Sequence, residues 1–230
     1  MGELIRPVEP RRLYQVIADQ IRASIQAGQF PPLARLPAER ELAQMFGVSR
    51  PSLREALIAL EIDGSVEVRM GSGIYVTASR ARPDLEGRSL GDSPSEIMQA
   101  RVAIEGSVVV MACARIDADL LATLRRLLDS MRNMIEAGGV PLDQDRAFHM
   151  ALAVHSGNSV LARLVGELFD ARQGAILATL SRKFESGTTW RVALREHEAI
   201  LVALEAADPL RTEAAMRTHL QCSAERWLGT

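Results

Sequence analysis

The sequence has few of the apolar segments that direct a protein into or across a membrane. Its first residues, MGELIRPVEPRR, include no apolar run of the kind found in signal peptides. No uninterrupted apolar run further along reaches the length needed to span a bilayer. We therefore expect a cytoplasmic protein.

Cysteine is scarce as well, since Cys113 and Cys222 are the only two in the chain. They form no closely spaced pair, and both fall in segments with a helical pattern. We expect two buried thiols, and neither a disulfide nor a redox pair.

An excess of positive charge is also missing. The chain has 27 Lys and Arg against 29 Asp and Glu, which gives a formal net charge of −2. No overall field draws the protein to nucleic acid, so any such binding must come from locally placed arginines. With 230 residues, 47% of them hydrophobic, the chain can bury a sizeable core in one or two domains.

The pattern of the sequence changes near residue 80. Before it, helical spacing over residues 10–27, 37–46 and 49–63 is followed by SVEVRMGSGIYV, which alternates apolar and polar residues around the turn Gly71-Ser72-Gly73. Three helices and a hairpin predict a winged helix-turn-helix domain over residues 1–78.

A different composition follows this domain. Residues 79–92 are rich in Arg, Gly, Ser and Pro and are predicted to be a linker, and residues 93–230 are almost wholly helical. We predict six helices, over residues 94–116, 118–137, 144–155, 159–182, 190–206 and 209–228. Short connections favour antiparallel neighbours, so the predicted fold is mainly α, a winged helix-turn-helix plus an antiparallel six-helix bundle.

The stretch GVSRPSLREAL places Arg50 and Arg54 on one side of a helix, with leucines on the other. In a helix-turn-helix the start of this second helix faces the major groove, so Ser49 and Ser52 would also lie near DNA. Arginine can hold guanine through two hydrogen bonds, and serine hydroxyls suit phosphates. Taken alone, the stretch fits a solvated surface equally well.

The longer run FPPLARLPAERELAQMFGVSRPSLREALIALEIDGSVEVRMGSGIYV closely resembles the winged-helix domain of the GntR family of bacterial transcription regulators. The resemblance covers residues 13–76 and combines LPAEREL, GVSR, LREAL and GSG. It implies binding to double-stranded DNA. Arg40 would contact the DNA backbone or a base edge, and Gly71 would lie at the tip of the wing. The residues that would enter the groove are Ser49, Arg50, Ser52 and Arg54. Two residues depart from the family pattern: Leu33 replaces a usual glycine, and Ser65 a large apolar residue.

Three histidines and one aspartate form a second group of interest. In DQDRAFHMAL, Asp145 and His149 are four residues apart and so project from one helix face. His197 falls on an apolar stripe that should face the core, and His219 falls near the inward side of the last predicted helix. Burying several ionisable groups without a shared partner is costly, which favours a metal site. The alternative is a set of separate core histidines, each held by its own hydrogen bond.

The helical half resembles, more loosely and over about residues 93–228, the effector domain of the FadR subgroup in its six-helix FCD form. The subgroup has an aspartate and a histidine four residues apart, a second histidine on a later helix and a third on the last helix. The matching residues here are Asp145, His149, His197 and His219. The resemblance implies a divalent ion, with zinc and nickel among those reported. A set of nitrogen and oxygen ligands does not by itself determine which divalent metal binds. A six-coordinate ion would keep open positions for a small carboxylate.

Two arginines are candidates for binding that carboxylate. Arg101 matches an arginine of the subgroup and would clamp the ligand in a two-point fork. The alternative is an exposed arginine paired with Glu105 four residues later. Arg172, in FDARQGAI, is a candidate of the same kind.

The resemblance implies a DNA-binding transcription regulator, a repressor that responds to a small organic acid. A homodimer would call for a near-palindromic operator. Two alternatives stay open: a metalloenzyme, for which no clear catalytic acid or base stands out, and a sensor of the metal itself. We expect a regulator and no enzyme.

Overall fold

The computed structural model describes residues 11–69, 71–78 and 90–228. It divides the chain into two compact units, Met1–Ser93 and Pro94–Thr230, and each is described by itself. Most of the predicted linker, residues 79–89, lies outside the described residues. No described helix combines the length and the apolar character that a membrane crossing needs.

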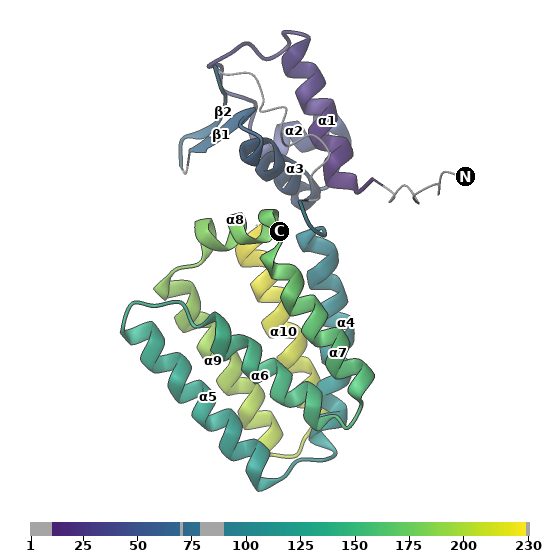
Figure 1. Ribbon diagram of the computed structural model, residues 1–230, viewed down its shortest axis with the longest axis vertical. Helices are drawn as coiled ribbons and strands as arrows, with labels where there is room; N and C mark the ends of the chain where they lie inside the picture. The colour runs from purple at the N-terminus through teal and green to yellow at the C-terminus, as the bar shows by residue number, and fades with distance from the viewer. Residues whose placement is uncertain (1–10, 70, 79–89, 229–230) are drawn as a thin grey trace, which may run out of the picture. The chain divides into compact units, whose positions relative to one another are not determined.

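The first unit is a winged helix-turn-helix, which confirms the prediction (Figure 1). Its elements are α1 (Leu13–Gln26), α2 (Glu39–Phe46), α3 (Arg50–Ile62), β1 (Val66–Arg69) and β2 (Gly73–Val76). Gly47 makes the turn between α2 and α3 with a φ of 64°, a left-handed conformation that glycine adopts without steric cost.

The core of this unit lies between α1 and α3, which pack against each other. Tyr14, Ile17 and Ile21 of α1 are buried there with Leu53 and Leu57 of α3. The strands pair antiparallel, with Val66 opposite Val76 and Val68 opposite Ile74. The fold leaves Ser49 and Arg50 exposed at the start of α3, and Gly71 and Ser72 exposed at the hairpin turn.

Both departures from the family pattern have a visible consequence. Leu33 has a φ of 65°, in the left-handed region where a side chain is strained, and it is 70% exposed. Its N–H donates to the carbonyl of Val76 at 3.0 Å, which holds the loop in place. Ser65 is buried, and its hydroxyl has no hydrogen-bond partner among the described residues.

The second unit is a bundle of antiparallel helices, as predicted. Its helices are α4 (Pro94–Cys113), α5 (Ala118–Glu136), α6 (Leu142–His155), α7 (Ser159–Asp170), α8 (Ala175–Phe184), α9 (Gly187–Glu205) and α10 (Pro209–Leu228). Asp117 and Asn158 cap α5 and α7, because their side chains accept hydrogen bonds from backbone N–H groups of the first turn.

The single helix predicted over residues 159–182 is wrong, because the chain breaks in its middle. After α7, the 3-10 turn Ala171–Gln173 leads to Gly174, whose ψ of 144° cannot continue a helix. The apolar spacing hides this break, since Val165, Phe169, Ile176 and Leu180 keep a helical period and are all buried. The turn separates α7 from α8 and carries Arg172.

The interior of the bundle is unusually rich in ionisable side chains. α10 packs against α4 and α9, and α6 packs against α4, α5 and α7 (Figure 1). These helices bury the ionisable residues Arg101, Glu105, Asp145, His149, His197 and His219. Charged groups are rarely buried without partners, so this interior is the candidate site.

The prediction of two buried thiols is confirmed for Cys113 and only partly for Cys222, and His155 lies outside the site. Cys113 is buried and Cys222 half-buried, and both are free thiols. His155 lies at the end of α6, and its ring Nε2 donates to the carbonyl of Arg115 at 2.6 Å, just past the end of α4. It is a capping residue outside the site.

Candidate functional site

The start of α3 presents small polar groups and an arginine. Ser49 caps the helix, because its Oγ accepts a hydrogen bond from the N–H of Ser52 at 3.2 Å. The two serine hydroxyls lie 2.8 Å apart, and Arg50 is exposed in the same turn. Hydroxyls, helix N-terminal amides and a guanidinium are the groups that proteins use on phosphates and base edges.

Arg54 is half-buried and paired. Its Nη2 lies 2.5 Å from Glu39 Oε2, and its Nε lies 3.3 Å from Oε1, which ties α3 to α2. To contact a base, Arg54 would have to divide its hydrogen bonds between Glu39 and the base, or give up the pair with Glu39. Arg40 and Gly71 are exposed, and Gly71 has a φ of 72° beside the wing. Contact with DNA by Arg40, Arg54 and Gly71 stays a prediction.

The structure brings the four predicted metal ligands together. Asp145 and His149 lie on α6, His197 on α9 and His219 on α10; all are buried, and one ligand atom from each lies within 4.8 Å of the others. Nε2 of His149 and Nε2 of His197 are 3.2 Å apart, and Asp145 Oδ1 is 3.2 Å from His197 Nε2. Ligands bound about 2.1 Å from one ion are about 3–4.2 Å apart, so one cation can nearly span this set.

The outward nitrogen of each ring has an acceptor, and this orients all three imidazoles. A proton on Nδ1 leaves the lone pair on Nε2, which points into the cluster. The Nδ1 acceptors are Glu105 Oε2 for His149 at 2.5 Å, the Ala193 carbonyl for His197 at 2.8 Å, and Glu196 Oε2 for His219 at 2.8 Å. The histidines thus lie in one cluster, and each also has the hydrogen bond of its own that the alternative of core histidines expects. Such outer acceptors usually accompany metal-binding histidines.

The charge states also suit a cation. Burial opposes ionisation of Asp145, but the nearby rings of His197 and His149 and the charge of Arg172 outweigh it and hold its pKa well below its usual range. Burial lowers the pKa of His149, and with the nearby His197 it lowers the pKa of His219 to about 3. Near neutral pH the carboxylate is charged and these two rings are neutral, which are the forms that bind metal.

Two glutamates behind the histidines were not predicted as parts of the site. Burial disfavours the charged form of Glu105, but Arg101 and His149 outweigh it and hold its pKa at about 2. Burial likewise disfavours the charge on Glu196, and hydrogen bonds from His219 and Arg226 hold its pKa at about 2. The sequence predicts Glu105 only as a partner of Arg101, and nothing in the local sequence links Glu196 to His219.

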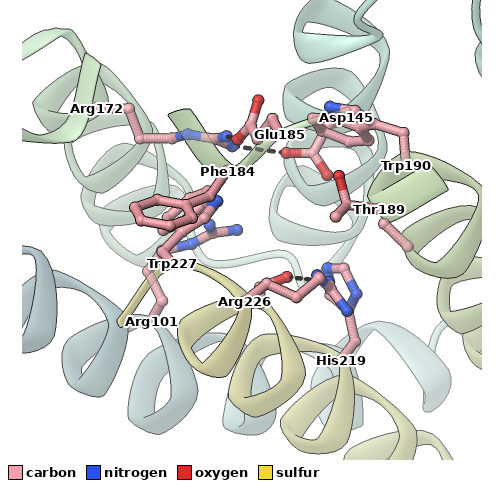
Figure 2. Close-up of a pocket in the computed structure, with 12 residues that line it drawn as sticks. Arg101, Asp145, Arg172, Phe184, Glu185, Thr189, Trp190, His219, Arg226 and Trp227 are labelled. Carbon is pink, nitrogen blue, oxygen red and sulfur yellow. Dashed lines mark hydrogen bonds and ion pairs between the residues drawn. The ribbon is translucent and has the colours of Figure 1, made fainter. Parts of the chain in front are cut away.

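A pocket adjoins the metal cluster, with a cavity volume of about 30 Å³ (Figure 2). Asp145 and His219 belong to both the cluster and the pocket wall. The remaining wall includes three arginines and three aromatic residues, namely Arg101, Arg172, Arg226, Phe184, Trp190 and Trp227. A molecule in this pocket would lie next to an ion held by the cluster.

Arg101 is buried, with 2% of its surface exposed, so the alternative of an exposed arginine is wrong. The expected pair with Glu105 does form, because Arg101 Nε donates to Oε1 at 2.6 Å. The guanidinium carbon lies 4.0 Å from the centre of the Phe169 ring, and Nη2 has no partner among the described residues. A buried donor without a partner on a pocket wall suits an anionic ligand.

Arg172 connects the pocket to a metal ligand. Its Nη1 donates to Asp145 Oδ2 at 2.8 Å, and its Nη2 donates to Glu185 Oε1 at 3.2 Å (Figure 2). Its guanidinium carbon also lies 5.0 Å from the ring centre of Trp227. Both predicted ligand-binding arginines therefore line the same pocket, and their contact with a ligand stays a prediction.

Comparison with protein families identifies both units. Residues 13–76 match the family described as bacterial regulatory proteins, gntR family. Residues 96–221, more than half of the chain, match the FCD domain.

Individual relatives agree with these matches. The chain is 30% identical over 212 residues to the Uxu operon regulator of Haemophilus influenzae, covering 91% of this chain and 80% of that protein. It is 33% identical over 222 residues to the Exu regulon transcriptional regulator of Escherichia coli strain K12, covering 93% and 83%. The solved structure of Streptococcus agalactiae GntR covers 92% of this chain and 99% of its own, with a TM-score of 0.51 and 27% identity. Both relatives are regulators, which confirms the prediction that the chain is no enzyme.

Proposed function

This chain belongs to the GntR family of bacterial transcription regulators and carries an FCD domain, and from this premise we propose that it is a repressor controlled by a small carboxylate bound at a divalent metal ion. DNA binding by the winged helix-turn-helix follows from the family. We assign DNA reading to residues 1–78 and binding of metal and effector to residues 93–230, with residues 79–92 as the linker.

The orientation of the three imidazoles carries the proposal of a metal. With the proton of each ring on Nδ1, toward its outer acceptor, the Nε2 lone pairs face one another and the Asp145 carboxylate among buried side chains. Four electron-rich atoms in a buried space repel one another unless a cation joins them. Asp145, His149, His197 and His219 would hold that ion, and zinc or nickel suits this set of nitrogen and oxygen donors.

The pocket beside the cluster supports a small carboxylate as effector. The bound metal would supply an electrophilic centre for one carboxylate oxygen. Arg101 offers its unpartnered Nη2 to the same anion, and Arg172 adds a second positive charge nearby. A carboxylate is therefore favoured over a neutral or cationic molecule.

Regulation requires that the effector change the affinity for the operator. A homodimer would present two α3 helices to a near-palindromic site about one helical turn of DNA apart. A coupling free energy of about 1–3 kcal/mol between binding of the effector and binding of the operator DNA would change operator occupancy substantially. Release of the operator on effector binding is the form we propose, because it is the commoner behaviour in the family that the chain resembles.

The test follows metal and DNA together. Metal content is measured by mass spectrometry before and after dialysis against a chelator, and the operator is obtained by selection from random duplex DNA. We expect about one ion per chain, and operator binding that weakens when a small acid is added to the metal-loaded protein. Operator affinity that follows metal concentration with no acid present would replace this proposal with the metal-sensor alternative. A protein that takes up no divalent ion would refute the site.

A further inference from the structure

The arginines of the first unit divide into paired and unpaired ones. Residues 11–69 and 71–78 contain eight arginines. Those that form ion pairs with carboxylates of the same unit are Arg11, Arg12, Arg22, Arg54 and Arg69. The guanidinium groups of Arg35, Arg40 and Arg50 have no hydrogen bond or ion pair with any residue that the structure describes. Arg40 and Arg50 are already predicted to contact DNA, which leaves Arg35 without an assigned role.

Arg35 lies on a short segment that extends the sheet of the wing. Backbone hydrogen bonds join residues 34–36 to β2, and one of them runs from the N–H of Leu36 to the carbonyl of Ile74 at 2.8 Å. Arg35 is thereby paired with Tyr75 across an antiparallel bridge. Paired residues present their side chains on the same face of a sheet, and neighbours along a strand alternate. The side chain of Arg35 therefore lies on the face opposite to the buried Leu36 and Ile74.

The guanidinium of Arg35 packs directly on the backbone of Gly73. A Cβ atom at this glycine would lie 2.6 Å from Arg35 Nε and 3.1 Å from Nη2, which is too close for ordinary packing. Gly73 also has a φ of 122°, a conformation that other residues rarely adopt. Glycine thus leaves room for the guanidinium beside the hairpin turn, where Gly71 and Ser72 are exposed. This packing restricts the exposed Arg35 side chain to one face of the wing.

An exposed guanidinium with no carboxylate partner is suited to a phosphate. Arginine binds phosphate oxygens through two parallel hydrogen bonds, and a side chain already restricted by packing loses less freedom when it binds. Arg69 differs from Arg35, although it lies on the same hairpin. It pairs with Glu67 at 2.7 Å, so a carboxylate already offsets its charge.

We propose that Arg35 is a further DNA-contacting residue, which binds a phosphate of the operator backbone and fixes the wing against the duplex. This inference rests on the part of the proposed function that assigns DNA reading to residues 1–78. It requires neither the metal nor the effector.

The experiment measures DNA affinity by fluorescence anisotropy over a range of salt concentrations, with the selected operator and with an unrelated duplex of the same length. Arg35→Gln should weaken binding to both duplexes about tenfold, because a phosphate contact carries no sequence information. The slope of log affinity against log salt should fall by about 0.9 for each protomer on the duplex. Arg35→Lys keeps the positive charge and should keep the parental slope.

The matched control is Arg69→Gln, which removes an exposed arginine of the same hairpin whose charge is already paired. It should change the affinity less than about twofold and leave the slope unaltered. Thermal melting of each variant establishes that it is folded, so that a change in affinity reports on DNA contact.

The outcomes separate this inference from the proposed function. Parental affinity and slope in Arg35→Gln would overturn the inference, and so would an equal loss in Arg69→Gln. A loss confined to the operator would also overturn it, since that result identifies a base contact. These three results leave the regulator and its DNA-reading unit intact. A parental protein that binds neither duplex would instead refute the DNA-reading assignment itself.

Discussion

Replacing Glu105 by glutamine tests whether the carboxylates behind the histidines support the metal site. Glu105 is 2% exposed and lies between His149 and the guanidinium of Arg101. It accepts from His149 Nδ1 at 2.5 Å and from Arg101 Nε at 2.6 Å. Glutamine keeps the shape of the side chain but removes the negative charge, so the Arg101 guanidinium is left buried beside a neutral group.

The size of the effect follows from the pKa of this carboxyl. A pKa of about 2 against the ordinary 4.5 corresponds to about 3 kcal/mol of stability, at ~1.4 kcal/mol per pKa unit. Because the pKa is lowered in the folded protein, this stability is present above about pH 4.5 and is lost as the pH falls toward 2. At pH 7, Glu105→Gln should lower the free energy of unfolding of the metal-free protein by about 3 kcal/mol. Glutamine has one acceptor oxygen for the two donors, Arg101 and His149, so metal binding should also weaken about 10–100-fold.

Two measurements check these values. Urea unfolding of chelator-treated protein gives the stability, and competition with a chromophoric chelator gives the zinc affinity. Glu167→Gln is the control, because Glu167 is exposed and pairs with Arg163 four residues earlier at 2.7 Å, so its loss should cost less than about 0.5 kcal/mol. A Glu105→Gln protein with parental stability and parental zinc affinity would refute the role given to Glu105.

Three further predictions address the other parts of the molecule. His197→Ala should leave the purified protein with substoichiometric metal by mass spectrometry, and full occupancy would remove His197 from the site. Arg50→Ala should weaken operator binding by about 1–3 kcal/mol in fluorescence anisotropy, with relaxed base preference if the contact is to guanine; normal binding by the double variant with Arg54→Ala would overturn the DNA-reading assignment. Leu33→Gly should raise the free energy of unfolding by about 0.5–1 kcal/mol, because glycine relieves the positive φ at the cost of a more flexible unfolded chain, whereas Leu33→Ala keeps the strain and should give no such gain. An unchanged urea midpoint for Leu33→Gly would show that the loop is unstrained.

Local patterns in the sequence were sufficient for features that belong to one element. Asp145 and His149 share a face because they are four residues apart on one helix, and the helical period is a property of the backbone alone. Ser49 and Arg50 could be placed at the start of α3 by the same reasoning. The apolar stripe of α9 likewise placed His197 in the core, where it is fully buried.

The break between α7 and α8 shows the limit of such patterns. The apolar residues keep their helical spacing on both sides of Gly174, so periodicity predicts one continuous helix. Gly174 adopts an extended conformation there, and Arg172 in the preceding turn reaches Asp145 on α6, 27 residues away. Glycine permits this conformation but does not require it, so the outcome depends on the surrounding helices.

The sequence by itself determined most of the elements, the winged helix-turn-helix and the residue types able to bind a metal. Only the tertiary structure decided which atoms meet. Glu105 reaches His149 across 44 residues of sequence, and Glu196 reaches His219 across 23. These pairs join different helices, so they exist only because particular helix faces pack together. The facing of helices is set by close packing of the whole bundle, and spacing within a single segment carries no information about it.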